Sequence, residues 1–409
     1  MDDSARPVQF VRKDTPARRL VRSFKISARS KTFRRRFFPD VTDDTWNDWH
    51  WQLRASLKGV PALERVFRLS EDEATAMQRN REGLPTGITP YYASLLDEQD
   101  AGQPLRRTMI MVNQEYVRTP DESVDPLSED HDSPVPGLVH RYPDRVLFLV
   151  TGTCPVYCRY CTRSRMVGAP GNEYEFSTTQ WERAIEYITN TPGVRDVLLS
   201  GGDPLLLSDE RLEWLLSRLR RIPHVEFLRI GSKVPVVLPQ RITPALVRIL
   251  KRYHPLWMSL HFVHPDELTP EVEQSCGRLA DAGIPLGSQT PLLAGVNDSV
   301  DTLSRLCHGL LRFRVKPYYL FQADLVVGTA HFRTPVSKGL EIMRSLRGHT
   351  TGYAVPVYAI DVPGGGGKIP LLPDSALVRD GDYLLLENYE GNVYRFPDPS
   401  QPRAADRDD

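Results

Sequence analysis

Short apolar runs alternate with amphipathic segments from Arg145 to about Asp361, and this alternation restricts the folds open to the chain. The apolar runs are typical of buried strands and the amphipathic segments of helices. Strands are expected at Val146–Val150, Val197–Leu199, Glu226–Ile230, Trp257–Phe262, Pro285–Ser288 and Lys316–Phe321, and helices at Thr178–Thr189, Asp209–Leu219, Thr243–Tyr253, Pro270–Ala282 and Val300–Leu311. Alternating strands and helices with short links form parallel β/α units. Six units predict an α/β fold, an open partial (β/α)6 barrel whose functional residues lie at the C-terminal ends of the strands.

The segments before and after this region have other patterns. Residues 1–36 carry twelve Lys and Arg against three Asp, a net charge of +9. Helices are expected after Thr42, an N-cap candidate, where Trp46, Trp49, Leu53 and Leu57 recur at helical spacing, then over Glu71–Gln78 and from Pro90. We therefore expect a basic arm and a helical N-terminal extension in residues 1–105, the barrel in 106–375, and a C-terminal hairpin with a polar tail in 376–409. The hairpin is expected at 387–396, with its turn at 390–392.

The overall composition excludes few functions. The 52 Lys and Arg balance the 52 Asp and Glu, so no global charge indicates a nucleic-acid partner. The basic arm could contact nucleic acid or a membrane surface, but a solvated arm is the simpler interpretation. The chain has no apolar run of about 18 residues and no apolar signal-peptide core. Reduced cysteines predict a cytoplasmic protein without a membrane segment.

Three of the five cysteines, Cys154, Cys158 and Cys161, lie in one loop directly after the first predicted barrel strand. Thiolates with this C-x3-C-x2-C spacing can bind three irons of a 4Fe–4S cluster and leave the fourth iron open to a small molecule. A structural zinc site needs four ligands, and no fourth Cys or His lies close in sequence. The odd number of cysteines in a long chain argues against a disulfide framework.

With the aromatic Tyr160 before its last cysteine, this loop resembles the radical S-adenosylmethionine (SAM) superfamily. The resemblance implies that SAM binds the open iron and that an electron from the cluster cleaves SAM to a 5′-deoxyadenosyl radical. It also implies that the stretch after the second predicted strand lines the methionine part of SAM through Gly201, Gly202 and Asp203. Without the cysteines, that stretch would read equally well as a plain turn between strand and helix.

A second unusual stretch is Pro363-Gly-Gly-Gly-Gly-Lys368. It fails the P-loop pattern, because Val362 stands where that motif needs Gly and Ile369 where it needs Ser or Thr. The glycines could expose backbone amides to a phosphate and position one lysine for a Schiff base with pyridoxal 5′-phosphate (PLP). The predicted phosphate-binding residues are Gly364, Gly365, Gly366 and Gly367. Taken alone, the stretch is more typical of a flexible surface loop.

The two stretches together resemble the lysine 2,3-aminomutase family, and the resemblance extends from about Phe38 to Pro397. It includes the segments 89–91, 140–145 and 331–338. The resemblance implies that Lys368 binds PLP covalently and that Gln289 contacts SAM. It further implies that PLP is contacted by Arg141, Tyr142 and Arg145.

The same resemblance assigns three substrate contacts. Arg163 matches the residue that binds the substrate carboxylate, while Asp324 and Asp361 match the pair that holds the ε-ammonium of lysine. Two neighbouring carboxylates repel each other, so they call for a cation between them. Because family members that act on glutamate replace these acids, the resemblance also argues against a glutamate substrate. Arginine fits as well, because a guanidinium also satisfies two carboxylates. For an isolated Asp, a loop cap or salt bridge would be the default interpretation.

The chain also departs from the family pattern. Ser299 stands where related enzymes carry a zinc-binding cysteine, and no cysteine follows Cys307, so zinc is doubtful. Tyr160 replaces a common histidine, and Phe321 replaces a tyrosine near the site. These two changes leave the preference between lysine and arginine open.

The expected activity is that of an isomerase: a radical SAM, PLP-dependent aminomutase that converts L-lysine to β-lysine by 2,3-amino migration. Alternatives are an arginine 2,3-aminomutase, a radical SAM enzyme without PLP such as a methyltransferase, and an iron–sulfur nucleic-acid-binding regulator. The expected partners are a small amino-acid substrate and an electron donor such as flavodoxin or ferredoxin, and the enzyme is expected to form a homo-oligomer. The sequence does not indicate the stereochemistry or the pathway.

Overall fold

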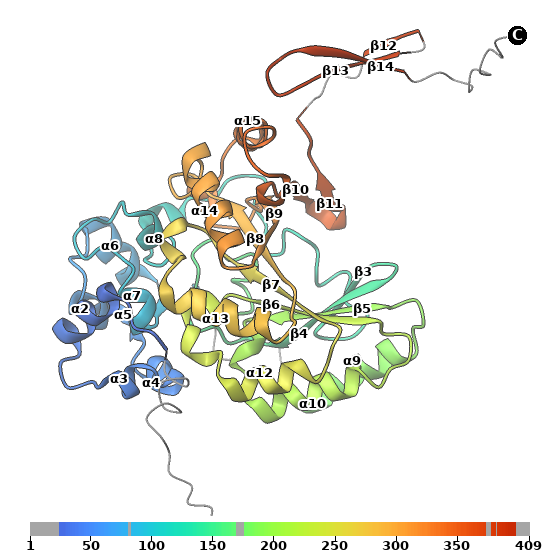
Figure 1. The fold of residues 1–409 in the computed structure, drawn as a ribbon. Helices are drawn as coiled ribbons and strands as arrows, with labels where there is room; N and C mark the ends of the chain where they lie inside the picture. The colour runs from blue at the N-terminus through green and yellow to red at the C-terminus, as the bar shows by residue number, and fades with distance from the viewer. Residues whose placement is uncertain (1–23, 81–82, 169–175, 374–377, 382, 398–409) are drawn as a thin grey trace, which may run out of the picture.

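A nine-stranded mixed sheet forms the centre of the computed structural model, which describes residues 24–80, 83–168, 176–373, 378–381 and 383–397 (Figure 1). The strand order is β11-β10-β9-β8-β7-β6-β5-β4-β3. Neighbours from β4 to β10 pair in parallel, whereas β3 and β11 pair antiparallel at the two edges. The bounds are β3 Leu138–Tyr142, β4 Arg145–Thr151, β5 Asp196–Gly201, β6 Phe227–Ser232, β7 Leu256–His261, β8 Leu286–Leu292, β9 Lys316–Gln322, β10 Val357–Val362 and β11 Gly367–Pro370.

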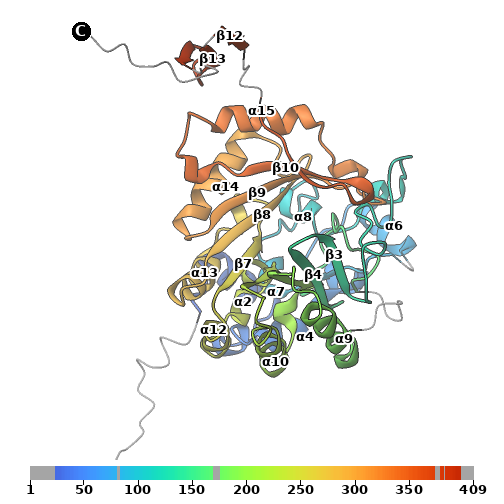
Figure 2. The ribbon, with the colours of Figure 1, turned by 90° about the vertical axis from the view of Figure 1, so that its right-hand side faces the viewer.

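The predicted partial barrel is confirmed, with one parallel strand more than expected. Helices cover the outer face of the sheet (Figures 1 and 2): α9 Thr178–Thr189, α10 Asp209–Leu219, α12 Pro244–Lys251, α13 Pro270–Asp281, α14 Val300–Arg312 and α15 Val336–Leu346. The unpredicted β10 follows α15 and pairs with β9, where Val357 lies opposite Tyr319. Sequence periodicity missed β10 because its short apolar run contains Asp361 and leads directly into the glycine stretch.

The strands alternate between a packed outer face and an open inner face, as the period of two requires. In β5, Val197 and Leu199 are fully buried beneath the helices, whereas Leu198 and Ser200 face the inside of the barrel. The β6 strand repeats the pattern: its outer side is apolar, and Arg229 lines the inside. The barrel interior is therefore a cavity rather than a packed core.

The N-terminal extension is largely helical. Its elements are α2 Ala28–Phe37, α3 Asp43–Trp46, α4 Trp49–Arg54, β1 Leu57–Lys58, α5 Gly59–Glu64, α6 Glu71–Arg79, β2 Gly87–Ile88, α7 Pro90–Ala93 and α8 Pro104–Arg107. Thr42 caps α3 as predicted. The helical spacing expected from Thr42 to Leu57 is instead divided, because the Asp48 side chain accepts a hydrogen bond from the backbone of His50 at 3.0 Å and starts α4. Leu57 lies in β1 rather than in a helix. Part of the basic arm forms α2, and its residues 1–23 lie outside the described residues.

Side chains of α7 tie this extension to the barrel. Tyr92 Oη donates a hydrogen bond to Glu267 Oε1 at 2.8 Å, and Tyr91 Oη lies 2.6 Å from the hydroxyl of Thr269. Thr89 Oγ1 donates to the backbone carbonyl of Val237 at 2.7 Å. The loops that follow β6 and β7 therefore rest on the extension, which supports the end of the barrel where the cysteines lie.

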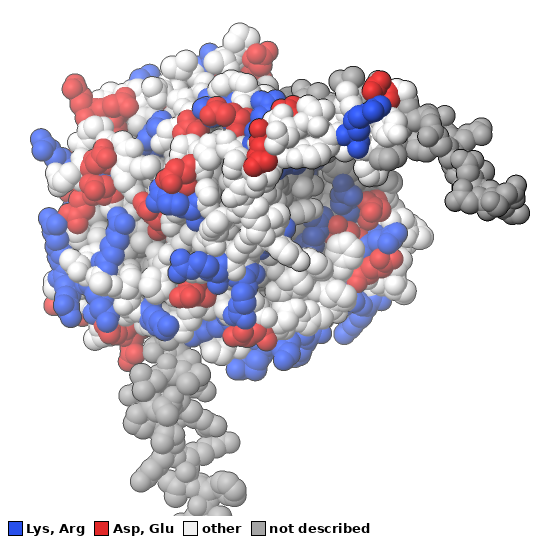
Figure 3. Space-filling view, turned by 45° about the horizontal axis from the view of Figure 1, so that its top comes forward, with Lys and Arg blue, Asp and Glu red and all other residues white. Residues whose placement is uncertain are grey.

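The predicted C-terminal hairpin is present, but it begins at Tyr383, whereas the sequence predicted a start at 387. Strands β13 (Tyr383–Glu387) and β14 (Val393–Pro397) pair antiparallel, and β12 (Val378–Asp380) extends them to a separate three-stranded sheet. The domain boundaries at 105 and 375 stay predictions. In the described part of the chain, no helix is long and apolar enough to span a bilayer. Basic and acidic side chains are interspersed on the face shown in Figure 3.

Candidate active site

A cavity of about 1130 Å³ occupies the inside of the barrel and extends past the C-terminal ends of its strands. All site residues predicted from the sequence line it, with the exception of the four glycines. The lining includes Cys154, Cys158, Cys161, Arg141, Tyr142, Arg145, Arg163, Gly201, Gly202, Asp203, Gln289, Asp324, Asp361 and Lys368. Residues from six strands and from loops far apart in the sequence thus meet at one site.

The three thiols lie close enough to influence one another. Burial raises the pKa of Cys161 to about 11, and the neighbouring Cys158 contributes to the rise. Burial and Cys161 likewise raise the pKa of Cys154. Such thiols stay protonated at neutral pH until a metal displaces the proton. Within the described residues, no three His, Cys, Asp or Glu side chains converge as a site for a single ion. Three thiols from one loop that line the same cavity fit ligands that each bind a different iron of one cluster.

An arginine inside the cysteine loop anchors that loop to the N-terminal extension and to the segment that follows it. Arg159 Nε donates to both carboxylate oxygens of Glu115 at 3.0 Å, and its Nη1 donates to the Leu84 carbonyl at 2.9 Å. Both charged side chains are buried, and such bidentate pairs fix geometry strongly. The sequence reading did not single out Arg159, although its place between the second and third cysteines was a usable signal.

Gly201 and Gly202 bring the end of β5 against the segment that leads into the cysteine loop. Gly201 has a φ of +115°, and a Cβ there would lie 2.5 Å from the carbonyl oxygen of Thr151. A Cβ on Gly202 would collide with the backbone of Thr153, which is adjacent to Cys154. Only glycine permits this approach, so these two residues help to set the position of the first cysteine.

The Asp203 carboxylate already has protein partners. It accepts hydrogen bonds from Ser232 Oγ at 2.8 Å, from the backbone N–H of Lys233 at 2.7 Å and from that of Val234 at 2.9 Å. Burial raises the pKa of Asp203, and these hydrogen bonds oppose the rise. Asp203 therefore fixes the loop after β6, and its main contacts are with this chain rather than with the cavity.

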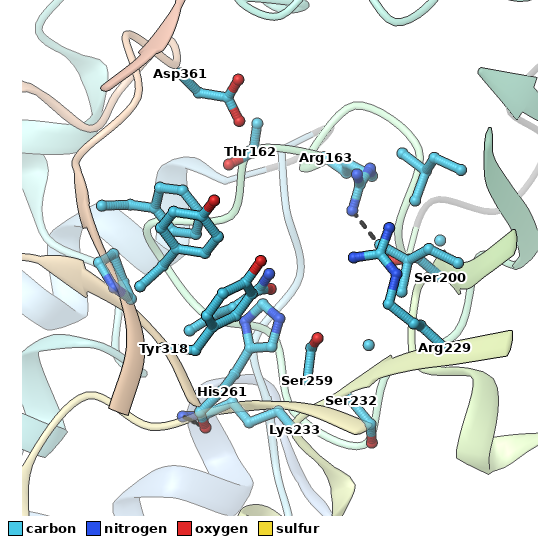
Figure 4. A pocket seen from close by; sticks show the side chains of 18 of the residues that line it. Thr162, Arg163, Ser200, Arg229, Ser232, Lys233, Ser259, His261, Tyr318 and Asp361 are labelled. Atoms are coloured by element: carbon cyan, nitrogen blue, oxygen red, sulfur yellow. Dashed lines mark hydrogen bonds between the residues drawn. The ribbon is translucent and has the colours of Figure 1, made fainter. Parts of the chain in front are cut away.

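Two aspartates and one lysine meet at another part of the cavity. Lys368 Nζ lies 2.5 Å from Oδ2 of Asp361, and Thr162 Oγ1 donates to Oδ2 of Asp324 at 2.6 Å. Burial raises the pKa of Asp324 to about 6; Asp361 contributes to the rise, while Thr162 and Lys368 oppose it. The other Asp361 oxygen, Oδ1, is buried and has no hydrogen-bond partner among the described residues. Figure 4 shows Thr162 and Asp361 close together at one end of the cavity.

The glycine stretch forms the turn between β10 and β11. Gly364, Gly365 and Gly367 have φ values of +70°, +86° and +76°, which favour glycine. Gly367 is buried against Tyr142, whose hydroxyl accepts a hydrogen bond from the backbone N–H of Lys368 at 2.9 Å. The four glycines do not line the cavity. In the structure they form this turn and leave space for the Tyr142 side chain.

The two arginines of the predicted PLP segment also line the cavity. Arg141 Nε donates to Asp132 Oδ2 at 2.6 Å, and the guanidinium of Arg145 lies 3.8 Å from the centre of the Tyr142 ring. Arg145 also donates to Asp144 Oδ1 at 3.1 Å. Each arginine thus has an acidic partner, and each still faces the space beside Tyr142 and Lys368.

Further lining residues were not predicted from the sequence. Glu129 binds the guanidinium of Arg163. Lys233 Nζ donates to Glu267 Oε1 at 2.7 Å, and burial lowers the pKa of His261 to about 4, so this imidazole is neutral at pH 7. Figure 4 shows Lys233 and His261 across the cavity from Thr162 and Asp361. No motif marks these residues, since each stands alone in its segment.

Comparison with known proteins agrees with this geometry. A family model described as the Radical SAM superfamily matches residues 148–306, which include the cysteine loop and Gly201-Gly202. The chain is therefore a radical SAM protein, with SAM and a 4Fe–4S cluster as its cofactors. A second model, described as Lysine-2,3-aminomutase, matches residues 343–409.

Curated relatives define the family more closely. L-lysine 2,3-aminomutase of Fusobacterium nucleatum is 52% identical over 366 residues, which are 90% of this chain and 86% of that protein. The enzyme of the same name from Clostridium subterminale is 51% identical, with 88% and 86% covered. Glutamate 2,3-aminomutase of Clostridioides difficile is 41% identical, with 87% and 84% covered. The chain belongs to the lysine 2,3-aminomutase family and is an isomerase.

Proposed function

We propose that this enzyme converts L-lysine to β-lysine by moving the α-amino group to the β-carbon, with PLP as a further cofactor. The observation that carries the proposal is the pair Asp324 and Asp361 beside a lysine ammonium. Asp361 contributes to the raised pKa of Asp324, and two neighbouring carboxylates are stabilised by a cation between them. The ammonium of Lys368 fills that role here and stands in chemically for the ε-ammonium of the substrate.

The unpartnered Oδ1 of Asp361 supports a second cation at this place. A buried carboxylate oxygen without a donor is costly, and a substrate ammonium with three N–H donors would satisfy it. A glutamate side chain would instead place a third carboxylate there, which the two aspartates repel. Arginine remains the second candidate, because a guanidinium offers five donors to the same two groups.

The surroundings of Lys368 fit PLP. The lysine lines the cavity on an edge strand, and Tyr142, Arg141 and Arg145 are neighbours that could hold an aromatic ring and a phosphate. When bound, PLP supplies a carbonyl carbon that holds the amino nitrogen and a π-system that delocalises an unpaired electron.

The chain's own residues bind and orient the substrate. Arg163 holds the carboxylate and the two aspartates hold the ammonium, so the aliphatic part of the substrate is extended between two fixed ends. Fixing both ends places one C–H bond toward the cluster side of the cavity, and the enclosed walls exclude water from a radical. We expect flavodoxin or ferredoxin as the electron donor and a homo-oligomeric enzyme.

Isotopic labelling tests the proposed migration. Anaerobic enzyme with SAM, PLP and a reductant would receive lysine that carries both ¹⁵N at the α-position and ¹³C in its carbon skeleton, mixed with unlabelled lysine. We expect ¹⁵N on the β-carbon of the product, with the label retained within single molecules. Product without label, or SAM cleavage without any β-amino acid, would contradict the assignment and favour a radical SAM reaction of another kind.

A further inference from the structure

We propose that Glu129 is a positioning residue that fixes the guanidinium of Arg163, so that one edge of it faces the cavity for the carboxylate of the amino-acid substrate. The proposal deepens the proposed function and rests on it. Glu129 belongs to the loop between α8 and β3 that carries no sequence motif, yet its side chain lines the cavity. It is 3% exposed, and a carboxylate so deeply buried requires a charged partner.

The contacts between the two side chains use one edge of the guanidinium. Arg163 Nε lies 3.1 and 3.0 Å from the two oxygens of Glu129, and Nη2 lies 2.7 Å from Oε1. On the other side, Nη1 donates to Ser200 Oγ at 3.3 Å, the bond drawn in Figure 4. Of the five N–H donors of an arginine, these contacts leave one on each terminal nitrogen. Two adjacent donors form the fork that binds a carboxylate in a bidentate way.

The backbone around Glu129 is built to hold this orientation. Ser128 has a φ of +54°, a left-handed conformation that is strained for a residue with a side chain and recurs at functional sites. Ser133 Oγ donates to the Glu129 carbonyl at 2.7 Å, and Arg141 Nη2 donates to the carbonyl of Leu127. The loop is therefore fixed on both sides of Glu129. The carboxylate is held in place, so rotation of the Arg163 guanidinium would break its hydrogen bonds to Glu129.

Two variants of Glu129 test the proposal. Glu129→Gln keeps the shape and removes the charge, and Glu129→Asp keeps the charge but shortens the side chain. Both should raise the KM for lysine roughly tenfold or more, the range expected for a lost hydrogen bond to a charged group. The KM for SAM, and reductive cleavage of SAM without lysine, should stay within about twofold, as expected where no shared contact couples the sites. Glu122→Gln is the matched control, because the Glu122 side chain is buried to a similar degree in the same loop but pairs with Arg333 outside the cavity.

A double-mutant cycle shows whether Glu129 acts through Arg163. In an Arg163→Lys background, Glu129→Gln should add no more than about twofold to the KM, because the residue it positions is gone. An unchanged lysine KM in both Glu129 variants would overturn the proposal. Effects of Glu129→Gln and Arg163→Lys that multiply as independent changes would also overturn it.

Failure of the proposed function would look different. Lysine, arginine and glutamate share the same α-carboxylate, so the Glu129 effect should appear with whichever amino acid is turned over. If none is turned over, the substrate assignment fails, and equilibrium binding of lysine to wild type and to Glu129→Gln still decides the role of Glu129. Equal affinities in that titration would overturn the proposal as well.

Discussion

Lys368 Nζ lies 2.5 Å from Oδ2 of Asp361, because the two residues are direct partners in the antiparallel pair of β10 and β11. The glycine turn between the strands sets this register, and a shift by one residue would point the two side chains to opposite faces of the sheet. The turn therefore couples the predicted PLP lysine to one of the two carboxylates predicted to bind the substrate.

Replacing Lys368 by Ala should remove PLP binding and product formation while leaving the cluster intact. Lys368 is the only nucleophile that we assign to PLP. Among the described residues, its side chain forms no hydrogen bond with the cysteine loop. The measurement combines PLP absorption, iron content per chain and product analysis. Wild-type PLP absorption together with full turnover in this variant would contradict the assignment.

Thr162→Val should weaken lysine binding. Thr162 donates a 2.6 Å hydrogen bond to the Asp324 carboxylate, and such a bond to a charged group contributes about 1.5–3 kcal/mol. The KM for lysine should therefore rise roughly tenfold to a hundredfold, since about 1.4 kcal/mol corresponds to a factor of ten. Thr162→Ser keeps the hydroxyl and should retain most of the affinity. Equal KM values in the Val and Ser variants would show that this hydrogen bond has no part in binding.

The pH dependence of kcat/KM for lysine should contain an acidic limb near the Asp324 pKa, which burial raises to about 6. Only the deprotonated carboxylate attracts an ammonium, so kcat/KM should fall as the pH drops through this value. The hydrogen bond from Thr162 lowers the pKa of Asp324. Thr162→Val removes this bond and should therefore move the limb to higher pH. If the Asp324→Asn variant keeps an acidic limb at the same pH, the limb reports the titration of another group and the assignment to Asp324 is wrong.

Gly202→Ala should reduce cluster incorporation, because a methyl group there collides with the Thr153 backbone next to Cys154. Overpacking of this kind costs roughly 1–3 kcal/mol and here displaces a ligand loop. Gly231→Ala is the control, since its added carbon would meet ordinary contacts at 3.7 Å or more. Iron content measured on both variants after reconstitution should fall only for Gly202→Ala. Equal iron content would contradict the role given to this close approach.

Much of the barrel was predictable from the sequence. The bounds of α9 and α10 agree with prediction to the residue, because their periodic apolar faces follow Ser177 and Ser208, both of which cap the helix with a side-chain hydrogen bond. The cysteine loop was predictable because three thiols within eight residues admit few explanations.

Contacts between distant loops were not predictable. Glu129 and Arg163 are 34 positions apart, and Thr162 and Asp324 are 162 apart, with no periodic pattern to relate them. The glycine stretch is conspicuous in the sequence, but its composition does not distinguish a phosphate-binding loop from a hairpin turn. The register of β10 and β11 makes that distinction, and only the fold supplies it.

The most direct test of the central claim is an anaerobic substrate comparison. Reconstituted enzyme with SAM, PLP and a reductant would be offered lysine, arginine and glutamate separately, and the β-amino acids would be identified by mass spectrometry. We predict β-lysine from lysine and no product from glutamate, because Asp324 and Asp361 select a cationic side chain. β-Glutamate as the main product would contradict the account, and β-arginine alone would keep the chemistry but overturn the substrate.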